Sequence, residues 1–357
     1  MQRIVALVFL VFMTGRASAD LIVGVDANYS LEMESKGSKW KWNDQAQELF
    51  AGMLAQGATS LRVRLWTNDD GPSGKNYVTA LIERAKKGGL DPWLVIFLSD
   101  DWADLTKQPA PKIWKDQPLD QRIATVRKYA EDIVRHMRQH GLTNHLYEIG
   151  NEIDFGICGV YPAKHAKKDP GELAGTTWPD AARIIKACEE GVKAADPDAK
   201  FMLHIAHWWD ADFCVAFFKF MQSHEMQVDF AGITYYPSSG IGGSLTFDQF
   251  RAVIDRVHDE TKLPIIIPET GYPSTADFSG QFAAWKREAP GYPLTPEGQE
   301  KWTRGLLGWC RQDAAVAGVY YWSPEWYGEG MWKAFALFDP SGEAKPAWKA
   351  FSRTQGR

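Results

Sequence analysis

Residues 263–269, Leu-Pro-Ile-Ile-Ile-Pro-Glu, decide the predicted fold. The run is apolar and contains no polar residue before Glu269. A strand with one face in water would alternate polar and apolar residues, whereas a strand of a parallel sheet is covered on both faces. The run therefore predicts a buried strand of a parallel sheet, with a carboxylate at its carboxyl end.

Seven further apolar, β-branched stretches have the same character, and helical patterns separate them. The strand candidates are residues 21–25, 60–66, 92–98, 145–150, 201–205, 230–235, 264–268 and 319–322. The helical patterns cover residues 44–56, 77–87, 119–139, 180–195, 211–222, 247–260 and 296–311. Eight strands alternating with helices predict a single (β/α)₈ TIM barrel. A doubly wound open sheet is the competitor, but no glycine-rich phosphate-binding motif follows the first strand.

The first 19 residues have the pattern of a signal peptide. A basic start at residues 1–3 is followed by an apolar run at 4–13 and by the small residues 17–19, Ala-Ser-Ala. The apolar run is shorter than the roughly 20 residues that a membrane-spanning helix needs, and no later stretch approaches that length. We therefore expect a secreted protein, extracellular or periplasmic, whose residues 20–357 form one catalytic domain without a membrane segment.

Composition narrows the range of partners. The 357 residues carry a net charge of −5, so no basic excess is present to neutralise the phosphates of a nucleic acid. The cysteines, at 158, 188, 214 and 310, are widely spaced and match no metal-binding motif. They could form up to two disulfides or remain buried thiols. We expect a monomer that requires no metal and no cofactor.

Two carboxylates stand out at the predicted carboxyl ends of the strands, where barrel enzymes place their active sites. Glu152 follows the fourth strand and Glu269 follows the seventh. Cleavage of an acetal needs such a pair, one carboxyl protonated and the other ionised. Either residue alone could be a helix cap or an ion-pair partner. Together they predict a glycoside hydrolase.

Further polar and aromatic residues near the strand ends are candidates for binding the sugar. Arg64 and Tyr235 could hold Glu269 ionised and correctly oriented, and Asn151 could bond a sugar hydroxyl. Of Arg62 and Arg64, we expect one to face the barrel interior and the other to face the helices. Sugar rings could stack on flat indole faces. The remaining candidates are Asp26, His204, Trp66, Trp102, Trp322 and Trp326.

At these residues the chain resembles glycoside hydrolase family 53, the endo-β-1,4-galactanases, within the clan of retaining (β/α)₈ hydrolases. The matching pieces follow in family order: Arg62-Val-Arg-Leu-Trp66, Ser99-Asp-Asp-Trp-Ala-Asp104, Gly150-Asn-Glu-Ile153, His204, Gly232-Ile-Thr-Tyr-Tyr-Pro237, Glu269-Thr-Gly-Tyr-Pro273, Tyr321-Trp322 and Ala336-Leu-Phe-Asp339. The resemblance implies that Glu152 is the acid/base and Glu269 the nucleophile. It also implies a β-linked polysaccharide or oligosaccharide as the substrate.

Some positions depart from the family pattern. Galactanases typically carry Asp-Phe-His-Tyr where this chain has Val95-Ile-Phe-Leu98, so Phe97 replaces a histidine that contacts sugar. Residues 238–240, Ser-Ser-Gly, replace a stretch that usually holds an aromatic residue, and Ser323 replaces an acidic one. The calcium-binding loop of some bacterial members has no counterpart. We therefore expect weaker activity on β-1,4-galactan than on some other β-linked glycan.

Three other functions fit the same residues. An exo-β-glycosidase and an endo-hydrolase of a different β-glycan would use the same pair of carboxyls. A non-catalytic carbohydrate-binding protein could share the barrel, although the presence of both Glu152 and Glu269, with Asn151 beside the first, argues against it.

Overall fold

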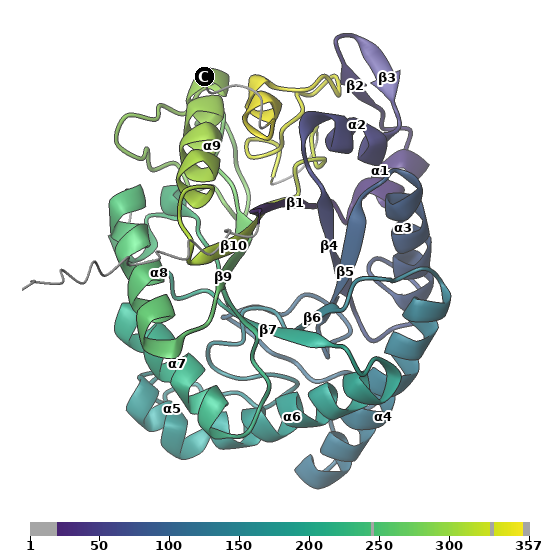
Figure 1. The fold of residues 1–357 in the computed structure, drawn as a ribbon, viewed down its shortest axis with the longest axis vertical. Helices are drawn as coiled ribbons and strands as arrows, with labels where there is room; N and C mark the ends of the chain where they lie inside the picture. Colours follow the sequence, from purple (N-terminus) through teal and green to yellow (C-terminus); the bar gives the residue numbers. More distant parts are fainter. Residues whose placement is uncertain (1–19, 244–245, 329–331, 353–357) are drawn as a thin grey trace, which may run out of the picture.

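The computed structural model describes residues 20–243, 246–328 and 332–352, so the expected signal peptide lies outside the described residues. Within these ranges eight parallel strands close into a barrel (Figure 1), in the order β1-β10-β9-β8-β7-β6-β5-β4. The strands are β1 Ile22–Asp26, β4 Ser60–Leu65, β5 Asp91–Ile96, β6 Leu146–Ile149, β7 Lys200–Ile205, β8 Phe230–Ile233, β9 Ile265–Thr270 and β10 Val316–Trp322. The predicted barrel is confirmed.

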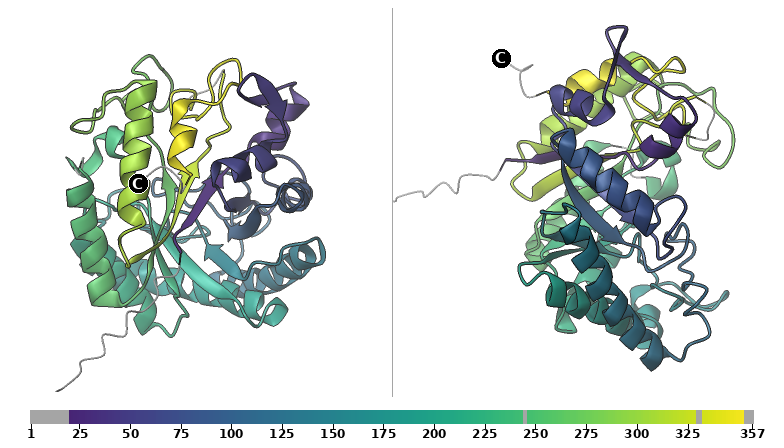
Figure 2. Two further views of the ribbon diagram at one scale, coloured as in Figure 1. Left: turned by 45° about the horizontal axis from the view of Figure 1, so that its top comes forward. Right: turned by 90° about the vertical axis from the view of Figure 1, so that its right-hand side faces the viewer.

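Helices cover the outside of the barrel (Figures 1 and 2). The long ones are α2 Leu49–Gln56, α3 Lys75–Lys87, α4 Leu119–Gln139, α6 Trp178–Ala195, α7 Ala211–Ser223, α8 Phe247–Thr261 and α9 Pro296–Cys310. The loops hold the short elements α1 Ser30–Ser35, α5 Pro170–Thr176, η1 Pro237–Ser239, η2 Ile241–Gly243 and η3 Pro346–Ala350. No helix in the described part of the chain combines the length and the apolar character needed to cross a bilayer.

The predicted helix over residues 44–56 is wrong in its first part. Strands β2 Trp40–Trp42 and β3 Gln45–Gln47 form an antiparallel hairpin there, and α2 begins only at Leu49. Asn43 and Asp44 connect the two strands with φ of 54° and 60°. Asn and Asp tolerate this left-handed conformation, which a two-residue hairpin turn requires at both positions. Asn43 and Asp44 therefore form a hairpin turn, although the residues after them also fit a helical pattern.

The barrel interior is filled by side chains. An apolar group inside it consists of Trp93, Val95, Phe97, Ala103, Leu146, Met202, Ile266 and Tyr320. Gly24 makes room for one of these, because a Cβ at that position would lie 2.2 Å from the Tyr320 ring. Arg62, Glu148 and His204 are fully buried together with this packing. The interior therefore presents buried charge as well as apolar surface.

The four cysteines are buried, unpaired thiols. Burial raises the pKa of Cys158 to about 12. The thiolate is the reactive form of cysteine, so this thiol is inert at neutral pH.

Candidate active site

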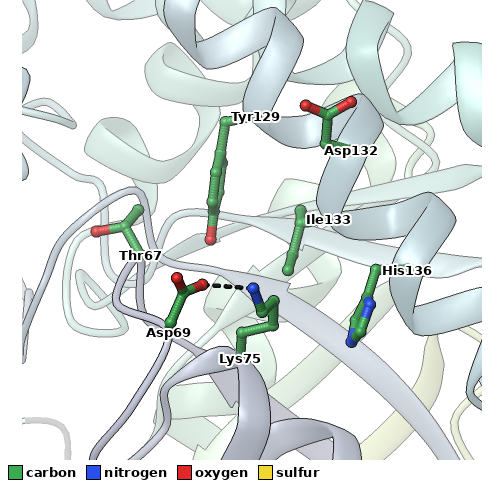
Figure 3. Close-up of a pocket in the computed structure, with 7 residues that line it drawn as sticks. All are labelled: Thr67, Asp69, Lys75, Tyr129, Asp132, Ile133 and His136. Carbon is green, nitrogen blue, oxygen red and sulfur yellow. Dashed lines mark ion pairs between the residues drawn. The ribbon is translucent and has the colours of Figure 1, made fainter.

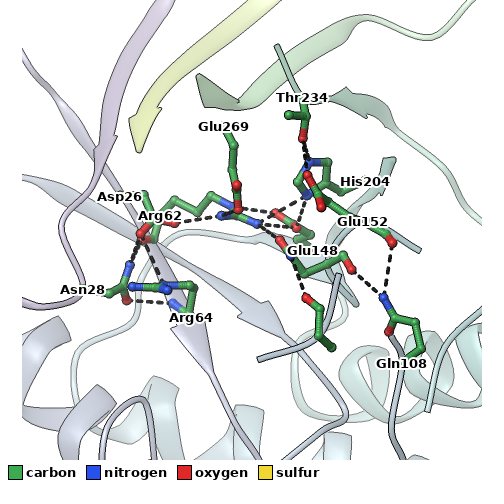
Figure 4. A network of polar contacts seen from close by, with 12 residues as sticks. Asp26, Asn28, Arg62, Arg64, Gln108, Glu148, Glu152, His204, Thr234 and Glu269 are labelled. Carbon is green, nitrogen blue, oxygen red and sulfur yellow. Dashed lines mark hydrogen bonds and ion pairs between the residues drawn. The ribbon is translucent and has the colours of Figure 1, made fainter. Parts of the chain in front are cut away.

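A buried arginine lies at the centre of the polar network at the mouth of the barrel (Figure 4). Arg62, on β4, donates to Glu148 at 2.6 and 2.9 Å and to Asn151 Oδ1 at 2.7 Å. It also donates to Asp26 Oδ2 at 2.7 Å and to Glu269 Oε1 at 2.8 Å. A guanidinium has five N–H groups, and each of them here has an acceptor. Arg62 therefore fixes four side chains, from β1, β6, β9 and the loop after β6, around one charge.

The expectation that Arg62 and Arg64 face opposite sides is wrong. Residues two apart on a strand point to the same face, and both guanidinium groups contact Asp26. Arg64 does not bond to Glu269, as its position had suggested; Arg62 makes that contact. Instead, Arg64 lies among three aromatic rings, those of Tyr29, Trp102 and Trp322, with centroids 4.7, 5.2 and 5.6 Å from its Cζ.

The tyrosine that contacts Glu269 is Tyr236, not Tyr235 as predicted. The Tyr236 hydroxyl donates to Glu269 Oε2 at 3.2 Å. Tyr235 points the opposite way and stacks on Phe250 of α8, with ring centroids 4.0 Å apart. Neighbouring side chains in extended backbone lie on opposite faces, so only one of two adjacent tyrosines can reach the barrel mouth.

Three of the predicted sugar-binding residues are engaged with the protein itself. Asp26 is fully buried, accepts from Arg62 at 2.7 Å and forms an ion pair with Arg64 Nε at 3.4 Å. The Asn151 amide accepts from Arg62 and donates to the backbone oxygen of Ala103 at 2.9 Å. Both ring nitrogens of His204 have partners within the network. These residues hold the site together, and their direct contact with sugar stays a prediction.

Glu269, at the end of β9, lies beside a full positive charge. Arg62 and Tyr236 both donate to its carboxylate. Burial raises the pKa of Glu269, and the positive charge of Arg62 opposes that rise. Opposite charge and hydrogen bonds of this kind favour the ionised form of a carboxyl.

Glu152 has different surroundings. Its Oε1 accepts from the Thr234 hydroxyl at 2.9 Å, and the described residues place no cation in hydrogen-bonding contact with it. Burial raises the pKa of Glu152 well above its ordinary value, and the negative charges of Glu269, Asp154 and Asp104 add to the effect. The residue has a left-handed backbone, with φ of 46°. Gln108 holds this segment by donating to the backbone oxygens of Asn151 and Glu152 at 2.8 and 3.2 Å.

The indole rings of Trp102, Trp322 and Trp326 lie close to one another beside the network. Trp102 and Trp322 lie edge to face with centroids 5.8 Å apart, and Trp326 packs against Tyr29 at 4.1 Å. Trp66, Trp102 and Trp326 are half-buried, whereas Trp322 is buried beneath its neighbours. Partly exposed aromatic rings at a barrel mouth are suited to packing against the apolar faces of sugars.

Phe97 does not lie on the surface of the site. Its side chain is fully buried, and its ring centroid is 5.8 Å from that of Trp102. A substrate would therefore feel this substitution through the position of Trp102.

Comparison with known proteins gives the family. A family model described as Glycosyl hydrolase family 53 matches residues 22–351, which is nearly all of the described chain. The chain belongs to glycosyl hydrolase family 53. It is therefore a glycoside hydrolase, an enzyme that acts on O-glycosyl bonds.

Individual relatives of this family 53 hydrolase are distant but cover almost its whole length. An arabinogalactan endo-beta-1,4-galactanase of Cellvibrio japonicus is 27% identical over 92% of this chain and 90% of its own. A protein of the same name from Thermothelomyces thermophilus is 25% identical, covering 92% and 98%. The GH53 catalytic domain of Ignisphaera aggregans superposes with a TM-score of 0.82 at 24% identity, covering 95% and 97%. The last comparison supports the barrel fold.

Sequence reasoning missed several members of the family 53 site. Glu148 lies within β6, and Thr234 directly follows β8. Trp285 comes from the segment after β9, and its half-buried ring lies 5.1 Å from Tyr236. Glu148 could have been identified from the sequence, since it is the one charged residue in the short buried strand Leu146–Ile149.

Other clusters lie apart from this network. A surface pocket of about 220 Å³ between α3 and α4 (Figure 3) contains none of the network residues and holds the ion pair Lys75–Asp69 at 2.6 Å.

A group of possible metal ligands lies near the amino ends of β6 and β7 and consists of His145, Asp196 and Asp198. Arg138 already donates to Asp196 at 2.8 Å and compensates its charge.

Proposed function

We propose that this family 53 hydrolase is a retaining endo-β-1,4-galactanase in which Glu152 is the general acid/base and Glu269 is the nucleophile. One observation carries the proposal: two buried carboxyls at the barrel mouth have opposite electrostatic surroundings. Glu269 accepts from a guanidinium, whereas Glu152 lies among acidic groups and accepts from a hydroxyl. The names of the relatives support galactan as the substrate.

The two environments suit the two steps of a double displacement. In the first step Glu152 donates its proton to the leaving oxygen while Glu269 attacks the anomeric carbon, and a glycosyl-enzyme forms. In the second step Glu152, now ionised, takes a proton from water, which displaces Glu269. Arg62 and Tyr236 keep Glu269 ionised and oriented for attack, since both donate to its oxygens.

Amide substitution of each carboxyl tests these roles. Glu269→Gln should abolish hydrolysis of both galactan and dinitrophenyl β-galactosides, because no glycosyl-enzyme can form. Glu152→Gln should lose about 10²- to 10⁴-fold on galactan but keep rapid release of dinitrophenolate, which needs no protonation.

A matched control is Glu189→Gln, which alters a buried glutamate on α6 that bonds to Lys193 at 2.6 Å. Its activity on both substrates should equal that of the wild type. Equal losses on the two substrates in Glu152→Gln would contradict the assigned roles.

A second candidate function is hydrolysis of a different β-linked glycan, and Phe97 favours it. This apolar residue supports Trp102, where the galactanase resemblance implies a histidine. Product analysis on a panel of galactan, β-glucans and mannans separates the two candidates.

We also propose that the enzyme is exported and acts as a monomer, without a metal or cofactor. The apolar run of residues 4–13 and the Ala-Ser-Ala of residues 17–19 support export. N-terminal sequencing of the protein recovered outside the cytoplasm should begin at Asp20, and size-exclusion chromatography with light scattering should give the mass of one chain.

A further inference from the structure

A continuous chain of hydrogen bonds leads from Glu152 into the barrel interior (Figure 4). Glu152 Oε1 lies 2.9 Å from Thr234 Oγ1, and the same oxygen of Thr234 lies 2.7 Å from His204 Nε2. On its other side, His204 Nδ1 lies 2.9 Å from Glu148 Oε1. All four residues are buried.

The far end of this chain fixes the tautomer of His204. Both oxygens of Glu148 accept from Arg62. Burial alone would raise the pKa of Glu148, but the charges of Arg62 and His204 lower it below the ordinary value. An ionised carboxylate has no proton to give. His204 Nδ1 must therefore carry a hydrogen and donate it to Glu148.

Thr234 has a single hydroxyl proton and two neighbours that can accept it. If Glu152 is ionised, the Thr234 hydroxyl donates to it, and His204 Nε2 must then carry a second proton to donate to Thr234. If Glu152 is protonated, it donates to Thr234 Oγ1, and the hydroxyl proton of Thr234 goes to a neutral His204. Both arrangements satisfy every hydrogen bond, and both hold the same number of protons.

We propose that Thr234 relays a proton between Glu152 and His204, so that the acid/base of the reaction shares its proton with a histidine that never touches the substrate. The proposal rests on the role given above to Glu152. The transfer is balanced: the carboxyl proton of Glu152 moves to Thr234 Oγ1 while the hydroxyl proton of Thr234 moves to His204 Nε2. Thr234 and His204 are thus positioning residues.

Removal of the shared proton is costly to this chain. Either Glu152 Oε1 or His204 Nε2 then lacks a donor, and an unsatisfied buried acceptor is unfavourable. Glu269, Asp154 and Asp104 face Glu152 and raise its pKa, whereas the hydrogen bond that Thr234 donates lowers it. The relay therefore stabilises ionised Glu152 through Thr234 while the shared proton rests on His204, so the pKa of Glu152 should be lower than it would be without Thr234.

The pH dependence of kcat/KM on galacto-oligosaccharides tests the relay. The alkaline limb of this profile, where kcat/KM falls as pH rises, reports the loss of the proton from Glu152 in the free enzyme. Thr234→Val removes the hydroxyl that donates to ionised Glu152 and should move this limb to higher pH by about one unit, the effect of one ordinary hydrogen bond. Thr234→Ser keeps a hydroxyl and should restore the wild-type limb.

Dinitrophenyl β-galactosides supply the internal control, since their leaving group needs no proton. Thr234→Val should leave kcat/KM on these substrates within about twofold of the wild type. A uniform loss on both substrates with an unmoved limb would show that Thr234 only positions Glu152, and would overturn the relay. A limb moved to lower pH would also overturn it. So would a wild-type His204 Nε2 signal that does not change along the limb, because Thr234 would then act only as a donor to ionised Glu152.

The nitrogen NMR signals of His204 give a second, direct readout, assigned by their loss in His204→Gln. In the wild type, the His204 Nε2 signal should change over the pH range of the alkaline limb, and in Thr234→Val it should no longer follow that limb. If Glu152→Gln had lost activity equally on both substrates, the proposed function would fail. If that test succeeds and only the Thr234 results are contrary, the relay alone fails.

Discussion

Two kinds of buried carboxyl lie at the same end of this barrel. Those of the first kind, Asp26, Glu148 and Glu269, all accept from the guanidinium of Arg62. Those of the second kind, Glu152 and Glu325, accept from uncharged donors, the Thr234 hydroxyl and the backbone N–H of Tyr29. Burial raises the pKa of Glu325 to about 8, whereas the charges around Glu148 lower its pKa despite burial. The bonded guanidinium therefore opposes the effect of burial on the pKa of Glu148 and of Glu269.

Removal of Arg62 should have the largest effect of any change at this site. Arg62→Met would leave Glu148 and Glu269 without their guanidinium and Asp26 with Arg64 alone, at a cost of about 3–5 kcal/mol in the free energy of unfolding. Activity should fall below detection. Thermal unfolding by circular dichroism and hydrolysis of galactan measure the two effects.

Arg64→Met is the matched comparison for Arg62→Met. Arg64 contacts Asp26 only at 3.4 Å. Arg64→Met should lower the free energy of unfolding clearly less than Arg62→Met does. Equal costs for the two variants would show that Arg62 is not the centre of the network.

The two adjacent tyrosines provide a smaller test. Tyr236→Phe removes a hydrogen bond to ionised Glu269 and should lower kcat/KM about 10- to 100-fold, since a hydrogen bond to a charged group contributes about 1.5–3 kcal/mol. Tyr235→Phe should leave activity unchanged, because among the described residues its hydroxyl has no hydrogen-bond partner. Activities that fall together in the two variants would contradict the orientations described.

The second kind of carboxyl, to which Glu325 belongs, can be tested through the thermal stability of the protein. A carboxyl whose pKa is raised by folding stabilises the protein fully at low pH, and this contribution is lost as pH rises from the unfolded value near 4.3 to about 8. Glu325→Gln cannot ionise. Its Tm relative to the wild type should therefore rise by about 2–4 °C between pH 5 and pH 8. A constant difference in Tm across that range would show that Glu325 is already ionised in the folded protein.

Phe97 should have the smallest effect. Phe97→His should raise kcat/KM on galacto-oligosaccharides, relative to other β-linked oligosaccharides, by less than about tenfold, because Phe97 acts through Trp102. If the wild type already prefers galacto-oligosaccharides by more than about a hundredfold, roughly 2.7 kcal/mol, Phe97 does not shift specificity.

The barrel could be predicted because each strand is a local pattern. The run at residues 263–268 is apolar throughout, and β9 begins and ends within two residues of the predicted bounds. The positions of Glu152 and Glu269 follow directly, since each comes at the end of such a run. The hairpin at residues 40–47 was missed because its two-residue turn lies within a sequence that also fits a helix.

The contacts among site residues could not be predicted in the same way. Arg62 bonds to Glu148 and Glu269, which lie 86 and 207 residues further along the chain. The choice between Tyr235 and Tyr236 depends on where β8 ends, at Ile233, and a shift of one residue reverses the answer. Local patterns place a residue at the barrel mouth, but its partners there come from other strands.

The central claim is that Glu269 is the nucleophile and Glu152 the acid/base. Incubation with a 2-deoxy-2-fluoro-β-galactobioside that carries a dinitrophenyl leaving group should trap the glycosyl-enzyme, since fluorine slows its hydrolysis. Mass spectrometry of the digested protein should find the added sugar on the peptide that contains Glu269, and Glu269→Gln should remain unlabelled. A label on the Glu152 peptide, or rapid turnover without any covalent adduct, would contradict the account.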